Sequence, residues 1–173
     1  MEMLEFLELF DSHHLPVYRF ALRLTGCVAD AEDIVQECFL SLLKPGCSYD
    51  ASRGPLRTYL FGIAWKQFLK RRDRRGETPE EIRGAAADAA DYFSPEHETL
   101  QAEMRDGVAR AVAQLPETQR VVLILAYYEQ MPLSEIAELL DVEVGAVKMR
   151  LQRARGQLKE SLAAYAPVRK EIL

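Results

Sequence analysis

The sequence predicts an all-α protein made of two small helical domains joined by a flexible acidic linker. Apolar residues recur at helical spacing over residues 3–24, and residues 133–158 divide into two short helices around a tight turn. Residues 76–94, by contrast, are dominated by Ala, Asp and Glu, a composition typical of a linker. The chain of 173 residues has room for one or two domains, and we place them at residues 1–75 and 95–173.

The overall composition excludes several classes of protein. The chain has no run of eighteen apolar residues, and residues 1–5 are acidic, so we expect neither a membrane span nor a signal peptide. The three cysteines form no CxxC or CxxH pair, and the histidines have no ligand partner at a useful spacing. We therefore expect reduced thiols in a cytoplasmic protein, with no metal site and no cofactor.

Three helices are expected in the first domain. The first covers residues 3–24, where Pro16 should kink the helix or start its second half. Asp30 has the properties of an N-cap for the second helix, with Asp33 three residues later as in a capping box. This second helix should continue to Leu43 and carry an acidic face beside its apolar stripe.

Pro55 is expected to begin the third helix, which runs to about Arg75. Although the whole chain has a net charge of −5, residues 44–75 carry nine basic and two acidic residues. Aromatic residues alternate with these cations, which suits single-stranded or melted DNA because bases stack on rings while cations follow the phosphates. For Phe61 and Trp65, packing in the core is an equally open alternative.

In the second domain, Ser94 and Pro95 predict a helix start, as N-cap and first helical residue, for a helix that runs to about Gln114. Another helix should begin at residues 115–117 and end near Tyr128.

Residues 133–158 have the pattern of a helix-turn-helix. Ala137 supplies a small side chain where the two helices must approach closely. Asp141 falls where the turn requires a positive φ, a conformation that Asp tolerates better than most residues. Val147 then anchors the second helix in the core.

The second helix of this pair has the layout of a recognition helix. Its buried stripe is narrow and holds Val147, Leu151, Ala154 and Leu158, and residues 146–159 include five basic residues and no acidic one. In such a helix the outward face reads bases and the flanking cations hold phosphates. An ordinary amphipathic helix with a solvated basic face is the alternative. The outward face presents Gly145, Ala146, Met149, Gln152, Arg153 and Gly156, flanked by Lys148, Arg150, Arg155 and Lys159.

At four stretches the chain resembles the extracytoplasmic-function (ECF) sigma factors, the smallest sigma-70-type initiation subunits of bacterial RNA polymerase. The four matches occur in the family's order and together cover nearly the whole chain. They are residues 30–39 (DAEDIVQECF), 56–64 (LRTYLFGIA), 115–120 (LPETQR) and 135–155, which begin with EIA and end with RAR.

The resemblance implies two all-helical domains, sigma regions 2 and 4, in a non-enzymatic subunit that directs promoter-specific initiation. The implied partners are core RNA polymerase through its β′ and β subunits, promoter DNA and an anti-sigma factor. The implied polymerase contacts are Asp33, Gln36 and Glu37. The implied minus-ten residues are Tyr49, Arg53, Arg57, Phe61, Trp65, Lys66, Lys70 and Arg71. The implied minus-thirty-five residues are Ala146, Lys148, Met149, Arg150, Gln152, Arg153 and Arg155.

Two other functions remain as alternatives. A helix-turn-helix regulator would bind promoters without polymerase, whereas a sigma factor should bind them weakly unless polymerase is present. A nucleic-acid enzyme would need a metal-binding acidic cluster or a nucleophile with a base. Asp30, Glu32 and Asp33 lie at a helix start without a histidine partner, which argues against such an enzyme.

Overall fold

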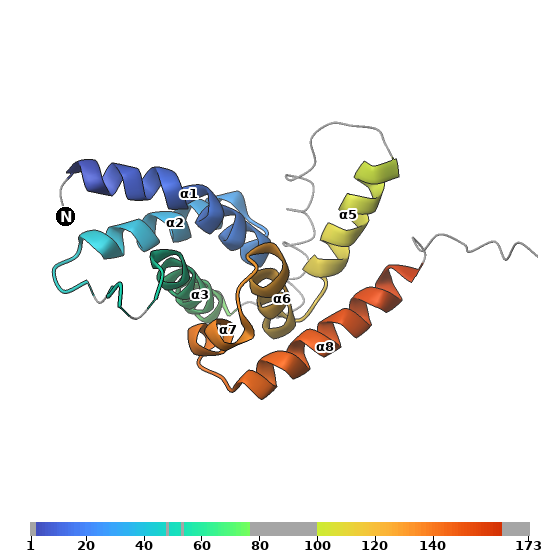
Figure 1. Ribbon diagram of the computed structural model, residues 1–173. Helices are drawn as coiled ribbons and strands as arrows, with labels where there is room; N and C mark the ends of the chain where they lie inside the picture. Colours follow the sequence, from blue (N-terminus) through green and yellow to red (C-terminus); the bar gives the residue numbers. More distant parts are fainter. Residues whose placement is uncertain (1–2, 48, 53, 77–99, 164–173) are drawn as a thin grey trace, which may run out of the picture.

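The computed structural model describes residues 3–47, 49–52, 54–76 and 100–163. Helices are the regular structure of these residues, as the sequence predicts (Figure 1). Arg53, residues 77–94 of the predicted linker and the predicted helix start at Ser94 lie outside the described residues. The helices are α1 (Met3–Thr25), α2 (Val28–Leu43), α3 (Leu56–Arg75), α5 (Leu100–Ala113), α6 (Glu117–Leu123), the π-helix η2 (Ile124–Tyr128), α7 (Leu133–Leu140) and α8 (Val144–Ser161).

The first three helices pack into what we call the N-terminal bundle. Helix α1 runs unbroken from Met3 to Thr25 with Pro16 inside it, so the proline does not start a separate helix. Phe39 of α2 packs edge-on against Phe10 of α1, with ring centroids 4.8 Å apart. Helix α3 ends at Gly76, whose φ of 63° is the left-handed conformation that glycine adopts without a steric penalty.

The prediction that Asp30 caps α2 was wrong. The helix begins two residues earlier, at Val28, and its N-cap is Cys27, so Asp30 lies inside the first turn. There the Asp30 carboxylate is buried and accepts two hydrogen bonds, of 2.6 and 2.7 Å, from the guanidinium of Arg75 at the end of α3. A partner 45 residues away, rather than the local helix end, therefore determines what Asp30 does.

Helices α5 to α8 form the C-terminal bundle, which contains the predicted helix-turn-helix. Asp141 follows α7 with φ 54° and ψ 53°, which confirms the predicted positive φ in the turn. Val147 and Ala154 of α8 are fully buried, and Ala137 of α7 is buried as well. The narrow apolar stripe of α8 thus holds this helix on the bundle and leaves its other faces outward.

The two bundles pack directly against each other. Helix α3 contacts α7, and α1 contacts α6, so the C-terminal bundle lies beside the N-terminal one (Figure 1). Buried apolar residues from both bundles form a single core cluster that includes Leu60 of α3 and Ile136 of α7. The sequence predicts two domains on a linker, but it does not predict this shared core.

Candidate nucleic-acid interfaces

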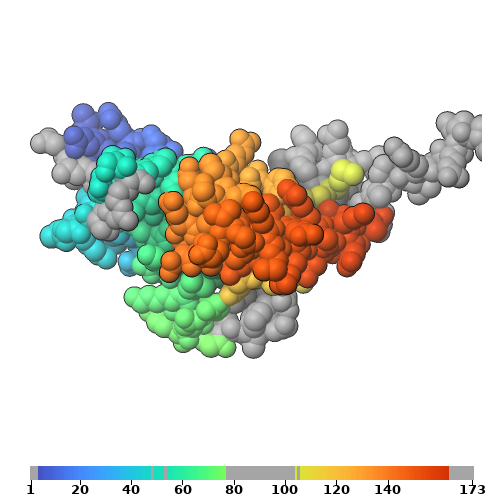
Figure 2. All heavy atoms as spheres, turned by 60° about the horizontal axis from the view of Figure 1, so that its bottom comes forward, coloured from blue at the N-terminus to red at the C-terminus, as the bar shows by residue number. Residues whose placement is uncertain are grey.

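Helix α8 presents its basic face to solvent. Lys148, Gln152 and Arg153 are exposed, and Met149 is 47% exposed beside them. Figure 2 shows the surface of α7 and α8 open toward the viewer. Ala146 and Arg150 are half-buried. The outward face thus carries polar side chains in its middle and cations at its sides, a layout typical of helices that bind in the major groove.

Arg155, at the flank of α8, is held in place by Tyr127 of η2. Its Nε–H donates a 2.6 Å hydrogen bond to the Tyr127 hydroxyl, and its guanidinium carbon lies 5.4 Å from the centre of the same ring. The π-helix places Tyr127, which is 51% exposed, next to the recognition helix. The contacts with Tyr127 therefore restrict the Arg155 side chain, which lowers the entropic cost of binding an anion there.

Arg57 lies in the first turn of α3 and is bound by the other bundle. Its Nη2 forms a hydrogen-bonded ion pair with Oε2 of Glu129, a residue 72 positions away that follows η2. The Glu129 side chain is only 6% exposed. Arg57 is the predicted minus-ten residue that the C-terminal bundle engages most directly.

Phe61 and Trp65 are both buried, at 0% and 8% exposure. The Phe61 ring packs 4.9 Å from that of Phe20, and the Trp65 ring stacks on that of Phe68 at 5.4 Å. The structure therefore places these two aromatic residues in the core instead of presenting them to DNA. Because both follow the 3.6-residue period of the buried face of α3, periodicity alone could not separate the two alternatives.

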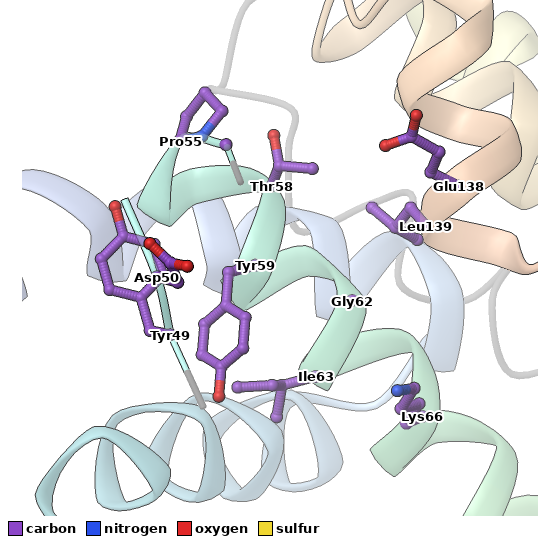
Figure 3. A pocket seen from close by; sticks show the side chains of 11 residues that line it. Tyr49, Asp50, Pro55, Thr58, Tyr59, Gly62, Ile63, Lys66, Glu138 and Leu139 are labelled. Atoms are coloured by element: carbon purple, nitrogen blue, oxygen red, sulfur yellow. The ribbon is translucent and has the colours of Figure 1, made fainter. Parts of the chain in front are cut away.

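A groove of about 350 Å³ lies between α3 and α7, beside the loop that precedes α3. Tyr49 from the loop and Tyr59 from α3 meet here with ring centroids 5.4 Å apart, and Lys66 lies further along α3 (Figure 3). Glu138 and Leu139 of α7 line the opposite side. The groove brings Tyr49 and Lys66 together, while Lys70 is exposed elsewhere on α3.

Arg71 is already paired within the N-terminal bundle. Its Nη1 lies 3.2 Å from Oδ2 of Asp33 and 3.8 Å from Oδ1 of Asp30, and its side chain is 17% exposed. Asp33 thus neutralises a predicted DNA contact. Gln36 is exposed on the same face of α2, and Glu37 is half-buried with its carboxylate 3.8 Å from Nζ of Lys44.

Several charged residues that are not among the predicted site residues lie between the bundles. Arg72 of α3 pairs with Glu117 of α6, and Arg23 of α1 lies 4.0 Å from Glu129. Arg120 of α6 is fully buried. Local sequence does not reveal these pairs, because Arg72 meets Glu117, and Arg23 meets Glu129, across the two bundles.

Within the described ranges, no helix is long and apolar enough to cross a membrane. The same residues contain no group of three or more His, Cys, Asp or Glu side chains arranged to hold a metal ion.

Comparison with known proteins gives two family matches and several relatives. Residues 9–78 match Sigma-70 region 2, and residues 105–158 match Sigma-70, region 4. The chain is 30% identical over 168 residues to the ECF RNA polymerase sigma factor SigW of Bacillus subtilis, covering 91% of this chain and 88% of that protein. It is 34% identical over 156 residues to the ECF RNA polymerase sigma factor SigL of Mycobacterium tuberculosis, covering 89% and 86%.

A solved structure shares the fold. It is the co-crystal structure of the sigma factor RpoE in complex with the anti-sigma factor NepR from Bartonella quintana. The match has a TM-score of 0.68 at 22% identity and covers 92% of this chain and 97% of that one.

Proposed function

The chain belongs to the ECF sigma factors of the sigma-70 family, non-enzymatic subunits that direct transcription initiation by RNA polymerase, and on this basis we propose which surface carries each step. Residues 1–75 act as region 2, which binds core polymerase and the minus-ten element. Residues 95–173 act as region 4, which reads the minus-thirty-five element, and residues 76–94 link the two. The protein works in the cytoplasm, where the polymerase and the promoter are.

The observation that carries the minus-thirty-five assignment is the exposed basic face of α8 behind the Asp141 turn. Gln152 and Arg153 are placed to contact base edges, while Lys148 and Arg155 are placed to contact phosphates. Met149 adds an apolar contact, and Ala146 and Arg150 border the face.

In region 2, we propose that the opened strand follows the loop before α3 and the adjoining face of α3. Tyr49 supplies an aromatic surface for an unstacked base, and Lys66 and Lys70 attract phosphates. Arg53, which stands between Tyr49 and α3 in the sequence, is proposed to contribute to the same contact. The exposed acidic face of α2, with Gln36 and Glu37, binds the β′ subunit of the core enzyme, and Asp33 contributes through its pair with Arg71.

The relative RpoE was crystallised with an anti-sigma factor, and we propose that this chain too is held by one. To identify that partner, proteins that co-purify with the chain would be tested for inhibition in the transcription assay below.

The test is in vitro transcription with core polymerase on a genomic library, which first identifies a promoter. Gln152→Ala and Arg153→Ala should change which promoters are used. Lys148→Ala and Arg155→Ala should weaken binding to all promoters and reduce the salt slope by about 0.9 per lost phosphate contact. Equal, sequence-independent losses for all four variants would refute the assigned faces.

The polymerase surface has its own test. Glu37→Lys should reduce association with core enzyme in a pull-down, whereas Glu8→Lys, an equal charge reversal on the exposed part of α1, should not. Undiminished association of Glu37→Lys would remove α2 from the docking site.

A further inference from the structure

Two arginines of the N-terminal bundle meet on one carboxylate of the C-terminal bundle. Arg57 of α3 pairs with Oε2 of Glu129, and Nη1 of Arg23, on α1, lies 4.0 Å from Oε1. The guanidinium carbon of Arg23 also lies 4.3 Å from the ring centre of Tyr128. Burial lowers the pKa of Arg23 from its ordinary value, while Tyr128 and Glu129 oppose that shift, and the guanidinium stays charged.

The Glu129 carboxylate is almost fully buried, so its charge requires these two partners. A guanidinium binds carboxylate and phosphate oxygens with the same fork geometry. When Glu129 moves away, Arg23 and Arg57 lose their carboxylate partner. The two neighbouring cations then favour binding of another anion. The two arginines therefore have the chemistry to bind a phosphate in place of the internal carboxylate.

Under the proposed function, the spacing of the two promoter elements requires the bundles to separate when both elements are bound, which takes Glu129 away from the arginines. The minus-ten and minus-thirty-five positions lie about 25 base pairs apart, or about 85 Å at 3.4 Å per base pair. In the structure α3 contacts α7, and α8 begins at Val144, four residues after α7 ends. Because α8 has 18 residues and is about 27 Å long at 1.5 Å per residue, this packed form cannot reach both elements.

The two DNA surfaces differ in how far this packing covers them. The base-reading face of α8 is exposed, whereas Arg57 is bound by Glu129. Two more carboxylates of the C-terminal bundle reach α3: Glu117 pairs with Arg72, and Glu135 accepts a 3.3 Å hydrogen bond from the Thr58 hydroxyl. The packed form thus leaves the outward face of α8 exposed, while carboxylates of the C-terminal bundle engage Arg57, Thr58 and Arg72 of α3.

We propose that Arg23 and Arg57 form a phosphate-binding site for the single strand of the opened promoter, and that Glu129 occupies it until the bundles separate. This rests on the proposed function and adds Arg23 to the minus-ten surface. It also makes Glu129 an intramolecular competitor of the DNA strand, so that binding at region 2 is coupled to separation of the bundles.

The first test measures binding of the full chain to two fluorescein-labelled probes of mixed sequence, a single-stranded oligonucleotide and the corresponding duplex. Glu129→Gln should bind the single strand about tenfold more tightly and steepen its salt slope by about 0.7 for each arginine released. Duplex binding through α8 should be unchanged. Glu8→Gln, which removes an exposed carboxylate of α1 that does not line the groove, is the matched control and should change neither.

The gain in single-strand affinity of Glu129→Gln must depend on the two arginines. Adding Arg23→Gln and Arg57→Gln to Glu129→Gln should abolish it. An unchanged single-strand affinity and salt slope in Glu129→Gln would overturn the proposal, as would a gain that persists in the triple variant.

A second test does not require removal of the buried acid. Gly62 and Leu139 face each other across the groove, with 3.9 Å between the position of a Cβ at Gly62 and Cγ of Leu139. A disulfide between Gly62→Cys and Leu139→Cys, with Cys27 and Cys47 replaced by Ser, should lock the packed form. The locked chain should bind the duplex and lose the single strand, and reduction should restore strand binding. Strand binding by the oxidised chain would contradict the proposal.

These assays need no polymerase, so their outcome is separable from that of the transcription test. Glu37→Lys could abolish transcription while Glu129→Gln still raises the affinity for the single strand. That result would show a defect in polymerase docking and would leave the masked phosphate site supported. Normal transcription without any strand gain would refute the masked phosphate site and leave the sigma-factor assignment intact.

Discussion

The buried guanidinium of Arg120 caps the C-terminus of α1: its Nη2 donates a 3.0 Å hydrogen bond to the carbonyl oxygen of Leu24, 96 residues away. Its Nη1 donates a 2.9 Å bond to the carbonyl of Ala113, the last residue of α5. The final carbonyls of a helix lack intrahelical donors, and the helix dipole favours a cation there. One side chain therefore completes two helix ends, one from each bundle.

Replacing Arg120 should destabilise the whole molecule. Arg120→Met keeps much of the side-chain volume but leaves two buried carbonyls without these donors, so the free energy of unfolding should fall by about 2–4 kcal/mol. Urea denaturation followed by circular dichroism measures this. Arg153→Met, on the exposed face of α8, should change stability by less than about 0.5 kcal/mol. Equal stability of the two variants would show that the hydrogen bonds of Arg120 to the two bundles do not stabilise the protein.

The positive φ of Asp141 predicts opposite effects of two substitutions. Asp141→Gly should leave stability unchanged or slightly raised, because glycine adopts φ 54° freely. Asp141→Val should lower the free energy of unfolding by about 1–2 kcal/mol, because a β-branched residue resists the left-handed region. Thermal denaturation ranks the two variants. A turn that accepts Val as well as Gly would disprove the assigned conformation.

Replacing Gly62 with alanine should stabilise the protein. It lies inside α3, and a Cβ there would make an ordinary contact at 3.9 Å with Leu139. Gly62→Ala should therefore raise the free energy of unfolding by about 1 kcal/mol through helix propensity, plus a small packing gain.

Gly156→Ala is the matched comparison, since Gly156 is also helical but faces open space. It should give the propensity gain alone. If Gly62→Ala were the less stable of the two, the close approach of α3 and α7 would be in question.

Cys38 should resist alkylation. Its thiol is buried and lies 3.7 Å from the carbonyl oxygen of Leu60, and burial, helped by the charge of Glu37, raises its pKa to about 12. Since the thiolate is the reactive form, iodoacetamide at pH 8 should modify the half-buried Cys27 and Cys47 well before Cys38. Mass spectrometry of the peptides reports the order, with urea-unfolded protein as the control. Early modification of Cys38 would place it outside the core.

Much of the candidate site could be predicted because its signals are local. The exposed face of α8 follows from the spacing of Val147, Leu151 and Ala154, and the Asp141 turn follows from which residues tolerate positive φ. For α3, the spacing of apolar residues predicted the helix but not which other helices pack against it. It could not show that Phe61 would be buried.

The sequence by itself determined the helices, the helix-turn-helix and the all-α class, because backbone preference and the 3.6-residue period act over a few neighbouring residues. Only the tertiary structure decided that Asp30 binds Arg75 and that Glu129 holds Arg57. These pairs join residues 45 and 72 positions apart, and nothing in either local segment specifies its partner. A buried charge needs an opposite partner, and that partner becomes available only when the helices pack: within the N-terminal bundle for Asp30 and between the bundles for Glu129.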